Sequence, residues 1–166
     1  MSNLIFVEAF LNSLKLPNKK AMFKLNRIGM DIVVIYLFIL LFIVSIPALF
    51  EQLGVTEGVA GDLPFILKLI YFFMFYYLPI TIGVFIFVSL ISYIGLGISK
   101  IMKRKLRYQI IWKLIAFTTT IPFLLYMILA FIYPISDRYL FLAIIYSLVL
   151  LVIMISKYPK RRVHKK

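Results

Sequence analysis

The sequence contains no cysteine, one histidine and few acidic residues, and each shortage excludes a class of chemistry. Without cysteine there are no disulfide bonds, thiolate metal sites or cysteine nucleophiles. The single histidine, His164, lies in a strongly basic tail, where solvation is its ordinary role. No phosphate-binding loop, dinucleotide-binding motif or metal-ligand spacing is present. We therefore predict that the protein is not an enzyme and has no catalytic residue, metal site or cofactor.

Charged residues are also scarce, because they make up 15% of the 166 residues whereas hydrophobic residues make up 64%. The mean hydropathy is +1.05. Soluble domains usually contain about a quarter charged residues, so this chain has too little polar material to cover a water-soluble core. The net charge of +13 is confined to short runs between long apolar segments. Such a pattern indicates membrane topology and argues against nucleic-acid binding.

Four long uncharged runs, residues 32–50, 69–99, 114–136 and 139–156, predict an all-α, polytopic integral membrane protein with four transmembrane helices. A bilayer core of about 30 Å requires roughly 20 helical residues. The runs lack the alternation of barrel strands, so helices are favoured. The predicted spans are residues 30–50, 63–98, 111–133 and 139–156 of a single membrane domain, 1–166.

The second run is too long for one upright span and too short for two. Pro79 removes a helical hydrogen bond and clashes with the preceding turn, so we predict a kink there. Residues 63–77 would then form an aromatic-rich approach along the outer surface, and the span itself would run from about Pro79 to Gly97. A re-entrant hairpin is the alternative.

The distribution of lysine and arginine predicts the orientation. All but two of the 19 basic residues lie in the segment 1–28, in the loop 99–110 with the adjoining Lys113, and in the tail 157–166. The positive-inside rule places this side, with both termini, in the cytoplasm, and we expect the cell (plasma) membrane as the location. We expect no cleaved signal peptide, because a polar segment of about 30 residues precedes the first span.

The N-terminal segment predicts an amphipathic interfacial helix over residues 3–16, ended by Pro17. Its apolar residues recur at helical spacing: Leu4, Val7, Leu11 and Leu14. A basic flank would hold such a helix on an anionic leaflet. We assign contact with anionic lipids to Lys19, Lys20, Lys24, Arg27, Lys103, Arg104, Lys105 and Arg107. The alternative is that the helix packs on the cytoplasmic ends of the protein itself.

A stripe of small residues in the second span predicts close helix packing. Ser89, Ser92, Gly95 and Ser99 follow one another at spacings that place them on one helix face. Membrane helices associate largely through such contacts. We favour a contact with another span of the same chain over a contact with a partner's helix.

Polar residues in the middle of the third span predict a kink. Thr118, Thr119 and Thr120 stand beside Pro122, and threonine hydroxyls can bond the backbone groups that proline leaves free. A polar pathway for a solute is the alternative. It lacks the charged groups at mid-membrane depth that ion-coupled transporters usually carry.

Two sequence blocks resemble a bacterial family of membrane proteins that contain a domain of unknown function. The first is Ser13-Leu14-Lys15-Leu16-Pro17, followed by Phe23, Ile28-Gly29, Ile32 and Tyr36; the second is Lys105-Leu106-Arg107-Tyr108-Gln109-Ile110-Ile111-Trp112, followed by Thr120-Ile121-Pro122. Members are often labelled maltodextrin utilisation proteins and are distantly similar to Yip-type membrane proteins. The resemblance implies a longer outer segment between the first two spans, whereas this chain has a short turn at about 51–63. It implies no active site.

These observations favour a non-catalytic membrane accessory or scaffold protein. Its expected partners are the lipid bilayer, anionic lipids at the cytoplasmic face, and a membrane-protein partner or a second copy of the chain. The first alternative is a subunit of a transporter, related to sugar or maltodextrin uptake. The second is a membrane enzyme that uses the outer acidic residues Glu51, Glu57, Asp62 and Asp137.

Overall fold

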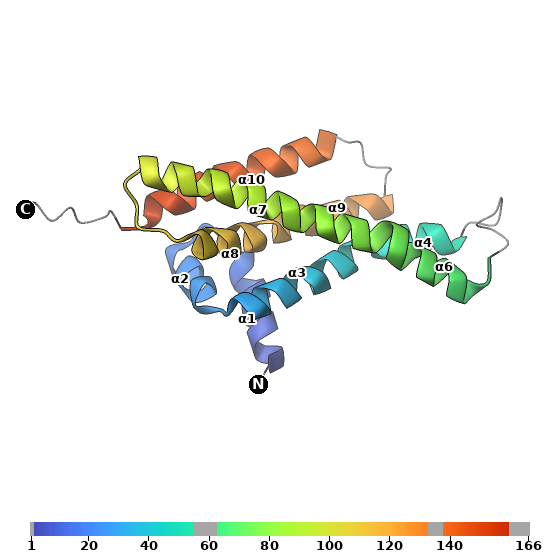
Figure 1. The fold of residues 1–166 in the computed structure, drawn as a ribbon. Helices are drawn as coiled ribbons and strands as arrows, with labels where there is room; N and C mark the ends of the chain where they lie inside the picture. The colour runs from blue at the N-terminus through green and yellow to red at the C-terminus, as the bar shows by residue number, and fades with distance from the viewer. Residues whose placement is uncertain (1, 55–62, 133–137, 160–166) are drawn as a thin grey trace, which may run out of the picture.

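The computed structural model describes residues 2–54, 63–132 and 138–159, and these ranges are all-α. The helices are α1 (Ser2–Ser13), α2 (Lys19–Arg27), α3 (Met30–Val44), α4 (Ile46–Gly54), α6 (Phe65–Phe72), the π-helical turn η1 (Phe73–Tyr77), α7 (Leu78–Ile101), α8 (Tyr108–Thr118), α9 (Thr120–Ile132) and α10 (Arg138–Lys157). The helices α3, α7, α8–α9 and α10 follow the long axis of the molecule (Figure 1). This arrangement confirms the predicted all-helical class.

The two ends of the bundle differ in charge. One end carries α2, the last residues of α7 and α10, and the start of α8 (Figure 1). We call it the basic end and define it as α2, residues 100–113 and residues 157–159. The opposite end carries α4, α6, the end of α9 and the start of α10 (Figure 1).

The prediction of four transmembrane helices is wrong by length. Within the described ranges, two helices are long and apolar enough to cross a membrane, Phe65–Ile101 and Tyr108–Ile132. A third span is present if α2 and α3, which are bent by 107° relative to each other, count as one. These spans support a membrane location for the protein.

The first predicted span, 30–50, is divided by a local break. α3 ends at Val44, and the hydroxyl of Ser45 donates to the backbone oxygens of Leu41 and Phe42, at 2.9 Å each. Pro47 follows at the second position of α4 and cannot donate a backbone hydrogen bond. The 15 residues of α3 span about 22 Å at ~1.5 Å per residue, which is less than a hydrocarbon core of about 30 Å.

The fourth predicted span, 139–156, lies in α10. The apolar helix that the structure assigns there is Phe141–Lys157, which is shorter than the two candidate spans.

The second predicted span is one continuous helix from Phe65 to Ile101. Its irregularity is the π-helical turn η1, which lies just before Pro79. The backbone N–H of Leu78 bonds the oxygen of Phe73 across this turn, and the hydroxyl of Thr81 donates to the oxygen of Tyr77 at 2.7 Å. A π turn changes the hydrogen-bond register by one residue. The chain therefore passes the proline without leaving the helix.

α8 is the central element of the core. Every residue from Leu114 to Thr120 is buried. α8 contacts α7, α2, α3, α10 and α1, and α9 continues it along α3. The sites described below are therefore positioned against a shared, close-packed helix.

Candidate functional site at the basic end of the bundle

α2 is the amphipathic helix of the basic end. Its apolar side, made of Ala21, Met22 and Leu25, is buried in the protein. Four cationic side chains are exposed: Lys19, Lys20, Lys24 and Arg27. Asn18 caps the helix by accepting a hydrogen bond from the backbone of Lys20 at 3.0 Å. All four cations of this helix, which the sequence assigns to lipid contact, thus face away from the core.

The loop between α7 and α8 supplies the other predicted lipid-contacting cations. Lys103, Lys105 and Arg107 are exposed. Lys103 has a φ of 53°, and this left-handed residue turns the chain directly after α7. Arg104 is different, because it is half-buried and its guanidinium donates to the backbone oxygen of Tyr158.

Three cations of the basic end bind backbone oxygens at the ends of neighbouring segments. The Lys113 Nζ donates to Asn26 at 2.6 Å and to Ile28 at 2.9 Å. The Lys157 Nζ donates to Pro17 at 2.6 Å, and Arg104 donates to Tyr158 in the same way. Backbone oxygens at helix ends have no partner inside their own helix, so these cations join α2, α8 and α10. The sequence did not reveal this role, because each pair is more than 50 residues apart.

The side chain of Tyr158 occupies the junction of α2 and α10. It is buried, and its ring lies 5.5 Å from that of Phe23, centroid to centroid. Burial raises the pKa of Tyr158 to about 12, since desolvation disfavours the phenolate. Its hydroxyl has no hydrogen-bond partner within the described part of the chain.

A pocket of about 360 Å³ opens between α1, α2 and the start of α3. Its polar lining comes from Glu8, Asn12, Lys24 and Arg27. Ile5, Ile28 and Ile32 supply the apolar lining, with Gly29 between them. The Lys24 Nζ lies 3.1 Å from Glu8 Oε1 in an ion pair. The combination of cationic and apolar walls suits an amphiphilic ligand.

α1 shows an unexpected orientation. Its buried side carries Ala9, Asn12 and Ser13, whereas Val7, Leu11 and Leu14 are exposed. The helix packs on α2, α8 and α9, and Phe6 and Phe10 also lie against the core. It therefore contacts the protein itself, which is the alternative that the sequence left open, while Val7 and Leu11 of the predicted apolar face remain on the outside.

The predicted kink residues of the third span lie together in the interior, whereas Pro79 of the second span is exposed on α7. α8 ends at Thr118 and α9 begins at Thr120. Thr118 and Thr119 donate to the backbone oxygens of Leu114 and Ala116, at 2.8 Å each. The Thr120 hydroxyl lies 2.7 Å from the hydroxyl of Tyr36, which lies 3.3 Å from that of Ser13. Pro122 is buried directly after this group.

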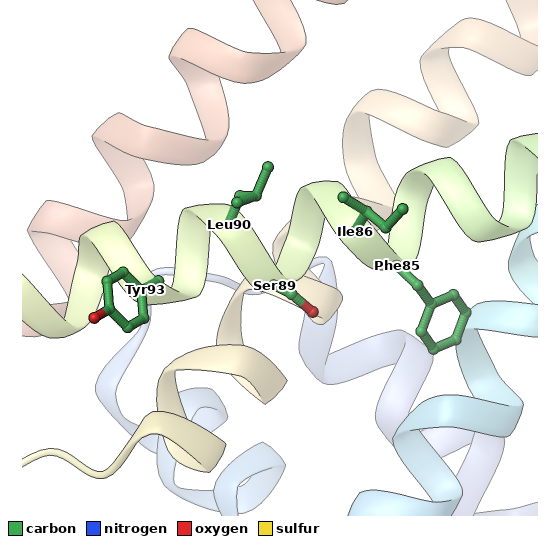
Figure 2. A pocket seen from close by; sticks show the side chains of 5 residues that line it. All are labelled: Phe85, Ile86, Ser89, Leu90 and Tyr93. Carbon is green, nitrogen blue, oxygen red and sulfur yellow. The ribbon is translucent and has the colours of Figure 1, made fainter.

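The small residues of α7 face two different environments. Ser92, Gly95 and Ser99 are buried, and a Cβ atom on Gly95 would lie 2.8 Å from Leu151 and 2.9 Å from Ile111. This part of the stripe therefore packs on α8 and α10 of the same chain. Ser89 accepts a hydrogen bond from Trp112 Nε1 at 3.1 Å. It also lines an open groove on α7 (Figure 2), with Phe85, Ile86, Leu90 and Tyr93.

Of the four acidic residues that the sequence offers on the outer side, the structure describes Glu51 alone. Glu51 is exposed on α4. Glu57, Asp62 and Asp137 lie outside the described residues, as do His164 and the end of the basic tail. In the described ranges no group of His, Cys, Asp and Glu could hold a metal ion.

Comparison with known proteins identifies a family for this chain. No curated protein and no solved structure matches the chain. A family model with the description "Protein of unknown function (DUF1189)" matches residues 56–155, which is more than half of the chain. The chain belongs to this family.

Proposed function

We propose that this protein is a non-catalytic integral membrane accessory protein whose basic end binds anionic phospholipids. The observation that carries the proposal is the geometry of α2, whose apolar side packs in the protein while four cations point outward. A basic amphipathic helix beside a membrane span is attracted to anionic head groups by about 1 kcal/mol per cation.

The orientation follows from the same charges. With the basic end on the cytoplasmic side of the cell membrane, α2 and the loop 102–107 lie at the leaflet that carries the anionic lipid. Both termini are then cytoplasmic. The exposed apolar residues of α1, Val7 and Leu11, would lie in the same interface.

A membrane-protein partner or a second copy of the chain is part of this proposal. The resemblance to maltodextrin utilisation and Yip-type proteins suggests a sugar transporter as one partner class. A transport role for the chain itself gains no support from the threonines of α8, because Thr118 and Thr119 bond their own backbone. Copurification in a mild detergent would identify a partner.

Lipid selectivity in reconstituted bilayers tests the proposal. Spin-labelled phosphatidylglycerol and phosphatidylcholine would be compared by electron paramagnetic resonance at low salt. We expect the protein to select the anionic lipid several-fold. Replacement of Lys19, Lys20, Lys24 and Arg27 by Gln should bring the selectivity close to one.

A matched control keeps the charge and changes only its chemistry. The variant with Lys19, Lys20 and Lys24 replaced by Arg should retain the selectivity, because both cations attract phosphate. Equal association of the two lipids with the unaltered protein would refute the proposed lipid binding.

A further inference from the structure

We propose that the pocket between α1, α2 and α3 binds the head group of one anionic phospholipid. Its phosphate would lie at Lys24 and Arg27, and the start of its acyl chains would lie against Ile5 and Ile32. This inference rests on the proposed function and narrows it from a charged surface to a single site.

The shape and lining of the pocket define the ligand class. The volume of about 360 Å³ falls in the range of small-molecule sites, roughly 300–1,000 Å³. Cationic side chains come from α2, and isoleucines come from α1 and from the start of α3. A ligand that satisfies both walls is negatively charged at one end and apolar at the other.

The position of the pocket matches the depth of lipid head groups. α2 and α3 are bent by 107° relative to each other, and the pocket lies in the corner that they form with α1. α2 is basic and α3 is almost entirely apolar. The corner therefore lies where the polar and apolar parts of the molecule meet.

Hydrogen bonds around and within the pocket hold this corner in shape. Lys113 donates to the oxygens of Asn26 and Ile28, which fixes the turn between α2 and α3. The Asn12 side chain donates to the oxygen of Glu8 at 2.7 Å. In the described part of the chain Arg27 has no ion-pair partner. The walls are thus preorganised while the cation that would meet the phosphate is available.

Glu8 determines which head group fits best. Its carboxylate pairs with Lys24, and the two side chains are 58% and 60% exposed, so a phosphate can compete for the lysine. An anionic lipid would be repelled by Glu8. A zwitterionic ethanolamine head group would instead use Glu8 to bind its ammonium. The lining has two cations and one acid, and a second carboxylate, that of the exposed Asp31, lies beside Gly29 at the edge of the pocket. We assign the pocket to an anionic lipid because the further exposed cations of α2, Lys19 and Lys20, add to the positive potential there.

Native mass spectrometry of the full chain tests this assignment with three lipids. Phosphatidylglycerol, phosphatidylethanolamine and phosphatidylcholine would be titrated separately, and the first bound lipid would be counted. We expect phosphatidylglycerol to bind most tightly. Arg27→Gln should weaken it about tenfold, the loss typical of one charge-assisted hydrogen bond. Glu8→Gln should strengthen it several-fold.

Lys20→Gln is the matched control. Lys20 is an exposed cation on the same helix but outside the pocket, so its replacement removes the same charge from the lipid-binding surface and should weaken the first bound lipid clearly less than Arg27→Gln does. Arg27→Lys retains the charge and should recover most of the binding. Melting temperatures of all variants would show that a loss of binding is not a loss of folding.

Each alternative outcome contradicts a different statement. Equal losses for Lys20→Gln and Arg27→Gln would refute the pocket but leave the lipid-binding surface of the proposed function intact. No preference for phosphatidylglycerol in any variant would refute both. Weaker phosphatidylethanolamine binding in Glu8→Gln, with phosphatidylglycerol unchanged, would assign the pocket to a zwitterionic lipid. Equal affinity for sn-glycerol 3-phosphate and for the lipid would show that the acyl chains are not bound.

Discussion

The hydroxyl oxygen of Tyr36 lies 2.7 Å from that of Thr120, although the two residues are 84 positions apart. Tyr36 on α3 also reaches the hydroxyl of Ser13 at the end of α1, at 3.3 Å. All three residues are buried. One phenol therefore joins α1, α3 and the junction of α8 and α9 in the interior of the protein.

Tyr36→Phe should destabilise the protein by about 1 to 2 kcal/mol, because it removes both bonds and leaves the buried Thr120 hydroxyl without this partner. Thermal unfolding in detergent, followed by circular dichroism, measures the effect. Thr120→Val should cost a similar amount. The double variant should cost clearly less than the sum of the two, and strict additivity would contradict a direct interaction.

Lys113→Met should loosen the corner between α2 and α3. The substitution keeps the length of the side chain but removes the donor to Asn26 and Ile28. A charge-assisted hydrogen bond contributes about 1.5 to 3 kcal/mol, so hydrogen exchange over residues 19–28 should accelerate at least tenfold. The exposed Lys105 offers the control. Lys105→Met should leave this exchange unchanged, and similar exchange rates in both variants would count against the clamp.

Several features of the basic end and of α7 could be predicted from the sequence because they depend on local pattern. Clustered lysines beside apolar positions indicated a charged surface, and α2 presents Lys19, Lys20, Lys24 and Arg27 outward. Gly95 and Ser92 stood on a predicted packing face, and both are buried. Local spacing is sufficient for such predictions, since a helix fixes which residues share a face.

Other features depend on contacts that no local pattern contains. The contact of Tyr36 with Ser13 and Thr120 and that of Lys113 with Asn26 join residues far apart in the chain. The number of spans was overestimated for a different reason. Hydropathy counts uncharged residues, but Ser45 and Pro47 end a helix without adding any charge.

Leucine substitutions at Gly95 and at Gly97 should separate the effect of packing on stability from the effect of helix propensity. A Cβ atom on Gly95 would lie within 3 Å of Leu151 and Ile111, whereas one on Gly97 would meet nothing within 4 Å. Gly95→Leu should therefore cost about 2 to 3 kcal/mol through overpacking. Gly97→Leu should be neutral or stabilising by up to about 1 kcal/mol, because leucine favours helix more than glycine does. Equal melting temperatures of the two variants would show that α7 does not pack as described.

The pH dependence of stability should reveal the buried phenol of Tyr158. Burial raises its pKa from the ordinary 10.0 to about 12, so the folded state retains the proton at a pH where the unfolded chain releases it. The stabilisation from this group is thus complete below pH 10 and is lost as the pH rises through 12.

Tyr158→Phe cannot ionise, and its ring can still pack on Phe23. Melting temperatures measured from pH 8 to 12 should therefore fall more steeply for the unaltered protein than for Tyr158→Phe. The remaining tyrosines and lysines are common to both proteins, so the difference between the two curves isolates Tyr158. Parallel curves would mean that this hydroxyl is solvated in the folded state.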